Sequence, residues 1–130
     1  MTAPEAVSVL VCTRDRPLSL RETVRGILEN DYRDFDLYVI DQSSDGESER
    51  ALQEWKGDNR LHYTRSDTRG LAHARNIGVG LARPGIVAMT DDDCCVPRQW
   101  LQQMVSAFSA GDRVAIVFGN VVPAKHDASN

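Results

Sequence analysis

Residues 7–12 (VSVLVC) form a short run of β-branched and apolar side chains without polar alternation. A run of this kind is typical of a strand in a parallel sheet, because helices cover both faces of such a sheet. It ends at residues 13–17 (TRDRP), where Pro17 suits the first turn of a helix. The helix is predicted from apolar residues at helical spacing, namely Leu20, Val24, Ile27 and Leu28.

The same pattern of strand and helix repeats along the chain. Strands are predicted at residues 35–40 (FDLYVI), 61–65 (LHYTR) and 86–90 (IVAMT), and β-like runs follow at 114–118 and 121–122. Ser44 and Glu47 have capping-box spacing at the start of a second helix. The apolar stripes of the second, third and fourth helices are, in order, Ala51, Leu52 and Trp55; Leu71, Ala74, Ile77, Gly78 and Leu81; and Leu101, Met104, Val105 and Phe108.

This alternation decides the fold class. Strands that alternate with helices of about three turns predict an α/β fold with a doubly wound, mostly parallel sheet and helices on both faces. The chain has 130 residues, of which 42% are hydrophobic and 26% charged, and this composition suits an ordinary globular domain. A chain of this length builds one core, so a single domain is expected over residues 1–130.

Composition also excludes several classes of protein. The net charge of −4 leaves no basic field for a nucleic-acid backbone. No stretch approaches the roughly 20 apolar residues of a membrane span, and the first residues do not resemble a secretion signal. The three cysteines, Cys12, Cys94 and Cys95, lack the spacing of a zinc site and are interpreted as small buried apolar side chains. We therefore expect a location in the cytoplasm, in solution or at the inner face of the membrane.

Ligands of doubly wound sheets bind at the carboxyl ends of the strands, beside the point where the strand order reverses. There the fourth predicted strand runs into Asp91, Asp92 and Asp93. Three adjacent carboxylates repel one another unless a cation neutralises them, and Mg²⁺ or Mn²⁺ binds carboxylates while leaving positions free for phosphate oxygens. A solvated turn or a helix-capping cluster is the alternative interpretation of the triplet.

Other polar residues follow the first two strands. Asp41 ends the second strand, where it could bind a ribose hydroxyl or a base N–H, or simply belong to a turn. Arg14 and Arg16 leave the first strand and could bind phosphate or base, although solvated arginines are common. Gly78 and Gly80 follow a helix and not a strand, so they are interpreted as packing or helix-end glycines and not as a dinucleotide fingerprint.

Three segments in this order resemble the donor-nucleotide half of family 2 glycosyltransferases with the GT-A fold, a Rossmann-like fold. They are VSVLVCTRDRP (7–17), VIDQSSDG (39–46) and RGLAHARNIGVGLARPGIVAMTDDD (69–93), and the resemblance extends over nearly the whole chain. It implies transfer of a sugar from a nucleotide-sugar, often a UDP-sugar, to an acceptor hydroxyl with inversion at the anomeric carbon. The acceptor could be a saccharide, a lipid or a small molecule.

The resemblance also implies roles for individual residues. The predicted nucleotide-binding residues are Thr13, Arg14, Arg16, Asp41, Arg75, Asp91 and Asp92. The triplet matches the family's DxD motif, so Asp91 and Asp93 are the predicted ligands of Mg²⁺ or Mn²⁺, with Asp92 as the alternative to Asp93. Arg75 lies in the match to the family's ARNxG segment and would support the nucleotide or the diphosphate.

One part of the family pattern is not matched. The carboxylate that acts as general base lies well downstream of DxD in this family, whereas neither Asp112 nor Asp127 has a matching context. No catalytic residue is therefore predicted, and the chain is interpreted as the N-terminal, donor-binding part of a longer glycosyltransferase domain. The alternative is a non-catalytic nucleotide-binding or interaction module that associates with itself through an exposed sheet edge.

Overall fold

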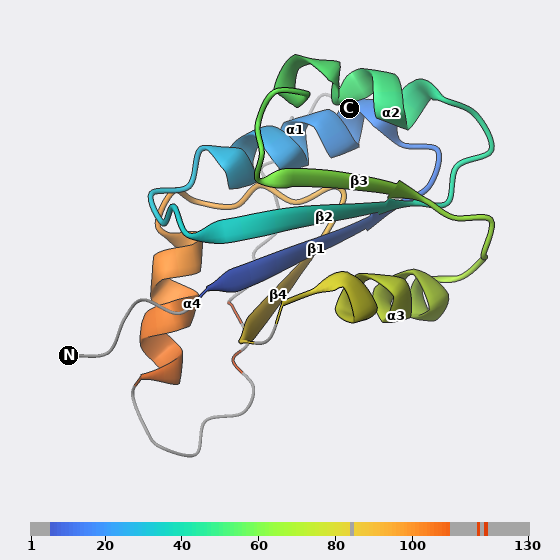
Figure 1. Ribbon diagram of the computed structural model, residues 1–130. Helices are drawn as coiled ribbons and strands as arrows, with labels where there is room; N and C mark the ends of the chain where they lie inside the picture. Colours follow the sequence, from blue (N-terminus) through green and yellow to red (C-terminus); the bar gives the residue numbers. More distant parts are fainter. Residues whose placement is uncertain (1–5, 84, 110–116, 118, 120–130) are drawn as a thin grey trace, which may run out of the picture.

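The computed structural model describes residues 6–83, 85–109, 117 and 119, and Figure 1 shows strands and helices alternating along them. The strands are β1 (Val7–Thr13), β2 (Phe35–Asp41), β3 (Leu61–Arg65) and β4 (Ile86–Asp91). The helices are α1 (Pro17–Leu28), α2 (Glu47–Ala51), α3 (Leu71–Leu81) and α4 (Trp100–Phe108), with a 3₁₀ turn, η1, at Gln53–Trp55. The predicted α/β fold is confirmed.

All four described strands are parallel, in the order β3-β2-β1-β4. The chain adds β2 and β3 on one side of β1 and then crosses to place β4 on the other side. The strand order therefore reverses between β1 and β4. Thr13 pairs with Asp41, and Cys12 pairs with Asp91, so the carboxyl ends of β1, β2 and β4 lie side by side.

Each face of the sheet is covered by helices, which explains why the central strand is apolar throughout. On one face, odd-numbered residues of β1 such as Val9 and Val11 pack with the buried side of α1 in the main core. On the other face, α3 lies close to β1 because Gly78 has no side chain. A Cβ at this glycine would lie 2.9 Å from Leu10 Cδ1, so its interpretation as a packing glycine is confirmed.

The second helix differs from the prediction. Ser44 does not cap it, because the N-cap residue is Gly46 and Asp45 Oδ1 accepts a hydrogen bond from the Glu47 amide at 3.1 Å. The Asp45 side chain thus makes the local turn that the capping box assigned to Ser44. The helix has five residues, and the 3₁₀ turn η1 follows it.

Two further expectations concern the ends of the fold. The β-like runs expected at residues 114–118 and 121–122 lie, apart from residue 117, outside the described residues. Asp112 and Asp127 also lie outside them. Among the described helices, none combines the length and apolarity needed to cross a membrane.

Candidate functional site

The three aspartates of the triplet have different environments. Asp91 is the last residue of β4, and Asp92 and Asp93 form the turn that follows. Successive residues of a strand point to opposite faces of the sheet, and the structure continues this alternation into the turn. The side chains of Asp91 and Asp93 are 65% and 55% exposed, whereas that of Asp92 is 9% exposed. Only the two outer aspartates therefore present their carboxylates to solvent.

Asp92 connects the triplet to the end of β1. Its Oδ2 accepts a hydrogen bond from Thr13 Oγ1 at 2.8 Å, and both groups are buried. Its Oδ1 lies 3.4 Å from Nη1 of Arg16, the residue before α1. The structure thus brings two predicted nucleotide-binding residues, Thr13 and Arg16, onto the middle aspartate and holds the turn against the neighbouring strand.

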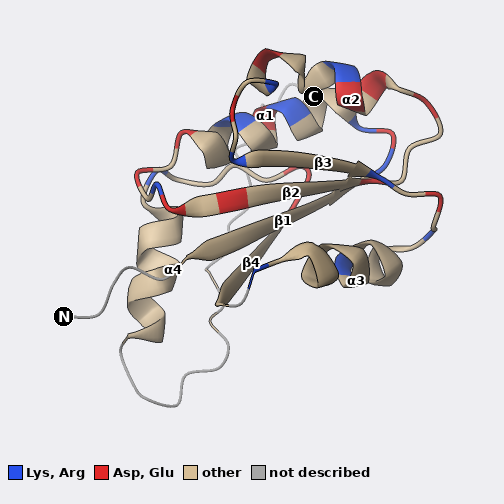
Figure 2. Ribbon diagram, in the orientation of Figure 1, with Lys and Arg blue, Asp and Glu red and all other residues tan. Residues whose placement is uncertain are grey.

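Arginines offset part of the charge of the outer aspartates. Nη1 of Arg16 also lies 3.4 Å from Asp93 Oδ2, and Nη2 of Arg75 on α3 lies 4.0 Å from Asp91 Oδ1. Figure 2 shows charged residues of both signs gathered near the arrowheads of β1, β2 and β3. Arg14 pairs with its neighbour Asp15 instead of with the triplet, and its Nε lies 3.8 Å from Asp15 Oδ2.

The outer aspartates also form a group that could hold a metal ion. One carboxylate oxygen each from Asp91 and Asp93 and the sulfur of Cys94 all lie within 4.8 Å of one another. The group contains both predicted metal ligands, whereas the carboxylate of Asp92 is not part of it. Carboxylate oxygens suit Mg²⁺ and Mn²⁺, so the donor set fits a divalent cation. The sequence analysis did not predict Cys94 as a metal ligand.

Helix α1 positions the loop that follows the triplet. Thr23 Oγ1 donates a hydrogen bond to the Cys94 carbonyl at 3.2 Å, and Asn30 Nδ2 donates one to the Pro97 carbonyl at 3.0 Å. Asn30 Oδ1 accepts a hydrogen bond of 3.0 Å from the amide of Leu101, which lies at the start of α4. Sequence analysis assigned no role to Thr23 or to Asn30, although Asn30 is fully buried. An asparagine just beyond the end of an amphipathic helix was the available signal.

The cysteines do not share one environment. Cys12 and Cys94 are partly buried, but Cys95 is exposed in the loop, so its interpretation as a buried apolar residue is wrong. Neighbouring residues in an irregular loop need not share a buried face as residues of a regular element do. Burial raises the pKa of the Cys12 thiol, Arg75 opposes this rise, and the carboxylates of Asp91 and Asp92 add to it.

Asp41 is fully buried at the end of β2, next to Thr13 of β1. Its Oδ1 accepts a hydrogen bond from the Ser43 amide at 2.9 Å, and its Oδ2 accepts one from the Tyr63 hydroxyl of β3. Burial and this hydrogen bond to the carboxylate raise the pKa of Tyr63 well above its ordinary value. The sequence analysis did not identify either partner. Asp41 therefore shapes the loop after β2, and its contact with a nucleotide stays a prediction.

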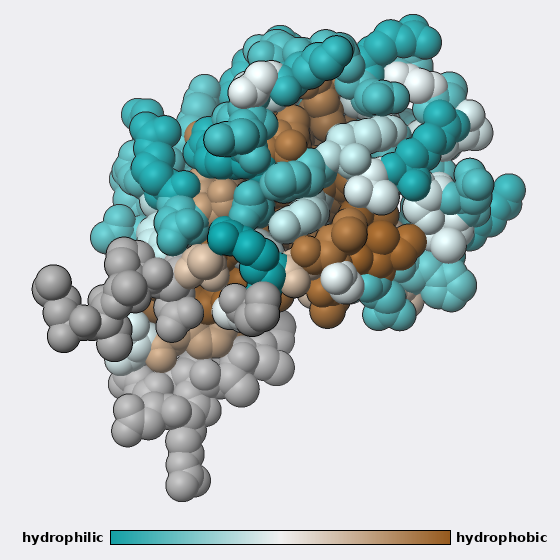
Figure 3. Space-filling view, viewed as in Figure 1, coloured by the Kyte–Doolittle hydropathy of each residue, from teal (hydrophilic) through white to brown (hydrophobic). Residues whose placement is uncertain are grey.

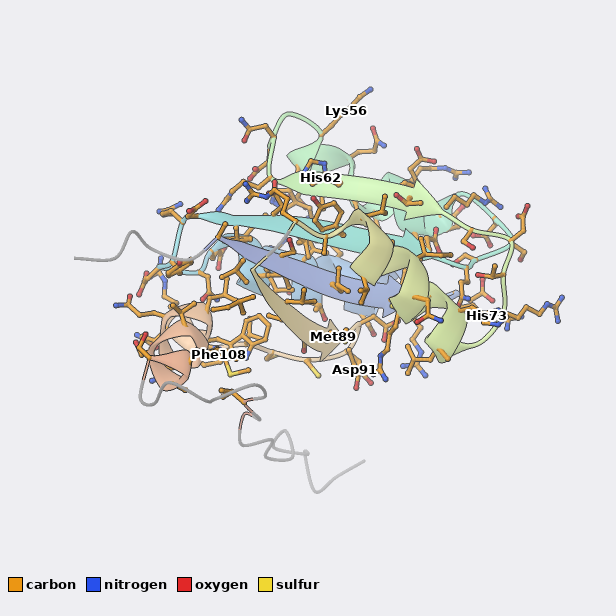
Figure 4. All side chains as sticks on the ribbon, turned by 60° about the horizontal axis from the view of Figure 1, so that its bottom comes forward. Lys56, His62, His73, Met89, Asp91 and Phe108 are labelled. Carbon is orange, nitrogen blue, oxygen red and sulfur yellow. The ribbon has the colours of Figure 1, made fainter. Side chains whose placement is uncertain are left out.

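A small pocket lies between α3 and the ends of β1 and β4, on the face opposite α1. Arg75 and Asp91 supply its charged groups, and in Figure 4 Asp91 and Met89 lie near each other on β4, beside α3. The full lining is Leu10, Cys12, Leu71, Arg75, Met89, Thr90 and Asp91.

Comparisons with known proteins point to one family of enzymes. The family model described as "Glycosyl transferase family 2" matches residues 8–128. The chain is 29% identical over 120 residues to a glucosyl-dolichyl phosphate glucuronosyltransferase of Haloferax volcanii, a match over 90% of this chain and 38% of that protein. It is 30% identical over 119 residues to glycosyltransferase AglE of the same organism, over 88% of this chain and 39% of that protein. The chain thus spans about two fifths of the length of these relatives.

Solved structures give the same fold. The mannosyltransferase PcManGT from Pyrobaculum calidifontis, in complex with GDP-Man and Mn²⁺, matches with a TM-score of 0.76 at 30% identity, over 87% of this chain and 34% of that one. TarS of S. aureus, residues 1–349 in complex with UDP-GlcNAc, matches with a TM-score of 0.74 over 92% of this chain and 37% of that one. Its identity of 19% shows the fold alone, and the expected GT-A fold is confirmed. With the match over residues 8–128, these findings establish that the chain belongs to glycosyl transferase family 2.

Proposed function

We propose that this chain binds the nucleotide-sugar donor of a glycosyltransferase, first of all a UDP-sugar, together with Mg²⁺ or Mn²⁺. The observation that carries the proposal is the group of Asp91, Asp93 and Cys94 at the strand-order reversal, with Arg16 and Arg75 beside it. The protein to which the chain belongs would transfer the sugar to an acceptor hydroxyl with inversion. Such a transfer also needs a base for the acceptor proton, and we assign none among the described residues.

The metal-holding residues in this proposal are Asp91 and Asp93, whose carboxylates are exposed and adjacent. A divalent cation bound there would offset the charge that develops on the departing diphosphate. Asp92 is a positioning residue, because its carboxylate is buried on Thr13 and keeps the turn at the end of β1. These different roles follow from the alternating directions of the three side chains.

The cationic residues would bind the diphosphate. Arg16 and Arg75 contact the triplet through long or exposed ion pairs, so they can move to phosphate oxygens at small cost. A guanidinium suits phosphate because it donates two parallel hydrogen bonds. We place Arg14 at the outer end of the same loop and the nucleoside near Asp41, which lies beside Thr13 in the register of β1 and β2.

Replacing Arg16 by glutamine is expected to affect the two ligands in opposite directions. Mn²⁺ alone should bind a few-fold more tightly, because Asp93 loses an exposed ion pair that competes with the metal. UDP in the presence of Mn²⁺ should bind about tenfold more weakly, because a charge-assisted contact is lost. Calorimetry measures both affinities.

Arg14→Gln is the matched control for the metal effect, because Arg14 pairs with Asp15 and not with the triplet. The Mn²⁺ affinity of this variant should equal that of the unchanged protein. A decrease in Mn²⁺ affinity on Arg16→Gln would contradict the competition.

Calorimetric titration of UDP and of GDP, each with and without Mn²⁺, tests the proposal itself. We expect binding that depends on the metal and a preference for UDP. GDP is included because the neighbour with 30% identity was solved with GDP-Man. Absence of binding in all four combinations would contradict the proposed function.

A second candidate function is a module that associates with itself. It is favoured by apolar side chains exposed on α3 and β4, namely Leu71, Val79, Leu81 and Met89. Figure 3 shows apolar residues gathered over this region. Sizing chromatography separates the candidates, because a monomer that binds UDP supports donor binding and a dimer without nucleotide affinity supports the module.

A further inference from the structure

We propose that Cys94 is a third protein ligand of the metal ion and makes the site select thiophilic divalent ions, such as Cd²⁺ and Zn²⁺, over Mg²⁺. This inference rests on the proposed function, because it concerns the same metal site. It goes beyond that function by naming the residue that sets which metal is bound.

The position of the sulfur supports the proposal. Ligands at about 2.0 to 2.3 Å from one ion lie within about 4.5 Å of each other. The Cys94 sulfur and the oxygens of Asp91 and Asp93 already lie within 4.8 Å of one another, so small rotations of these side chains suffice. Two of the three side chains are exposed carboxylates whose ion pairs with arginine are weak, so these side chains can rotate at small cost.

The backbone under Cys94 is also held in place. Its carbonyl accepts the hydrogen bond from Thr23 on α1, and Asn30 holds the same loop three residues further on, at Pro97. A ligand on an anchored backbone loses less conformational freedom when it binds than one on a free loop. Anchoring by α1 therefore favours Cys94 as a ligand.

The other cysteines provide a contrast. Cys95 is exposed and does not belong to the ligand group, although it is the next residue. Cys12 lines the pocket on the α3 face and also lies outside the group. Position in the loop, and not the presence of a thiol as such, singles out Cys94.

The chemistry of the donor set gives the selectivity. Two carboxylates alone suit hard ions such as Mg²⁺, whereas a thiolate prefers softer ions such as Zn²⁺ and Cd²⁺, and affinity generally rises from Mn²⁺ to Zn²⁺. When the ion binds, the thiol proton leaves to solvent and the sulfur bonds to the metal. Replacing the sulfur should therefore weaken Cd²⁺ and Zn²⁺ binding much more than Mg²⁺ binding.

Titration with Cd²⁺, followed by the ultraviolet charge-transfer absorption of a thiolate–Cd²⁺ bond, tests the proposal in a Cys95→Ser background, which removes the exposed thiol. We expect the band to appear at one equivalent of Cd²⁺ and to disappear on adding Cys94→Ser. Cd²⁺ affinity should fall by about tenfold or more, with Mg²⁺ affinity changed less. A band that persists without Cys94 would overturn the proposal.

Cys94→Asp is the control for a loss of metal binding that arises only from a change in structure. It keeps three ligands but replaces the soft one, so it should bind Mn²⁺ and shift the preference toward Mg²⁺. An unchanged metal preference in this variant would overturn the proposal. Mn²⁺ binding measured by electron paramagnetic resonance, with UDP titration beside it, separates the two hypotheses. If the Cys95→Ser protein binds Mn²⁺ and UDP without a thiolate band, the role of Cys94 fails and the donor site stands; if it binds neither, both fail.

Discussion

Asp93→Asn is expected to weaken metal-dependent UDP binding strongly while leaving the fold intact. Asp93 is exposed, and its ion pair with Arg16 is long and solvated, so its contribution to the free energy of unfolding is small. As a metal ligand it supplies one of two carboxylate charges, and its loss should weaken Mn²⁺-dependent UDP binding on the order of 100-fold. Calorimetry with Mn²⁺ and thermal unfolding of the same sample measure the two effects.

Asp92→Asn is the matched comparison, because it makes the same chemical change at the next residue. Asp92 is buried and accepts a hydrogen bond from Thr13, so this variant should lower the free energy of unfolding by about 1 to 2 kcal/mol. UDP binding should fall less than in Asp93→Asn, since the outer carboxylates remain. If the two variants exchanged these phenotypes, Asp92 would be the ligand and the assignment of Asp93 would be wrong.

The contrast between these neighbours marks what the sequence could and could not predict. The apolar run of β1 and the Asp triplet after β4 were sufficient to predict a parallel sheet with acidic groups at the strand ends. The different environments of Asp92 and Asp93 depend on which element lies on each side of the turn. Thr13 reaches Asp92 only because β4 is adjacent to β1, and this strand order is not a property of any local segment.

The misassigned residues have a similar cause. Ser44 fits a capping box as well as many true caps do, but Asp45 makes the competing turn. Cys95 was interpreted by residue type, while its exposure is decided by the path of an irregular loop. Arg14 and Arg16 could not be distinguished in sequence, and in the structure Arg16 is the one that contacts the triplet, while nucleotide binding by Arg14 stays a prediction. Local sequence patterns predicted the helices and strands, whereas contacts between helices, strands and loops determine the arrangement of the site.

Asn30→Ala is expected to lower the stability of the fold strongly, although the Asn30 side chain does not bond to any predicted metal- or nucleotide-binding residue. The side chain is fully buried and connects α1 to the loop before α4. Alanine leaves the buried Leu101 amide without this partner, whereas the Pro97 carbonyl still accepts a hydrogen bond from the Trp100 amide. A buried polar group left unpaired costs about 1 to 3 kcal/mol, so we expect the free energy of unfolding to fall by about that amount. Chemical denaturation measures this change.

Asp31→Ala is the control for this prediction. Asp31 is the next residue, its side chain is about half exposed, and its ion pair with Arg98 is long at 3.8 Å. Its backbone amide, which bonds the Arg98 carbonyl at 2.9 Å, is retained in the variant. The expected change is within about 0.5 kcal/mol. Equal effects of the two substitutions would show that the Asn30 side chain does not hold the loop.

The same variant connects stability to the metal site. Because Asn30 and Thr23 anchor the loop that carries Cys94, Asn30→Ala should also weaken Cd²⁺ binding under conditions where the protein is still folded. Changes that act through the supporting shell of a metal site lower affinity by about 10- to 100-fold. Thr23→Val removes only the bond to the Cys94 carbonyl and should weaken Cd²⁺ binding with a smaller loss of stability. If Cd²⁺ affinity stayed unchanged in both variants, α1 would support the fold without positioning the metal ligands.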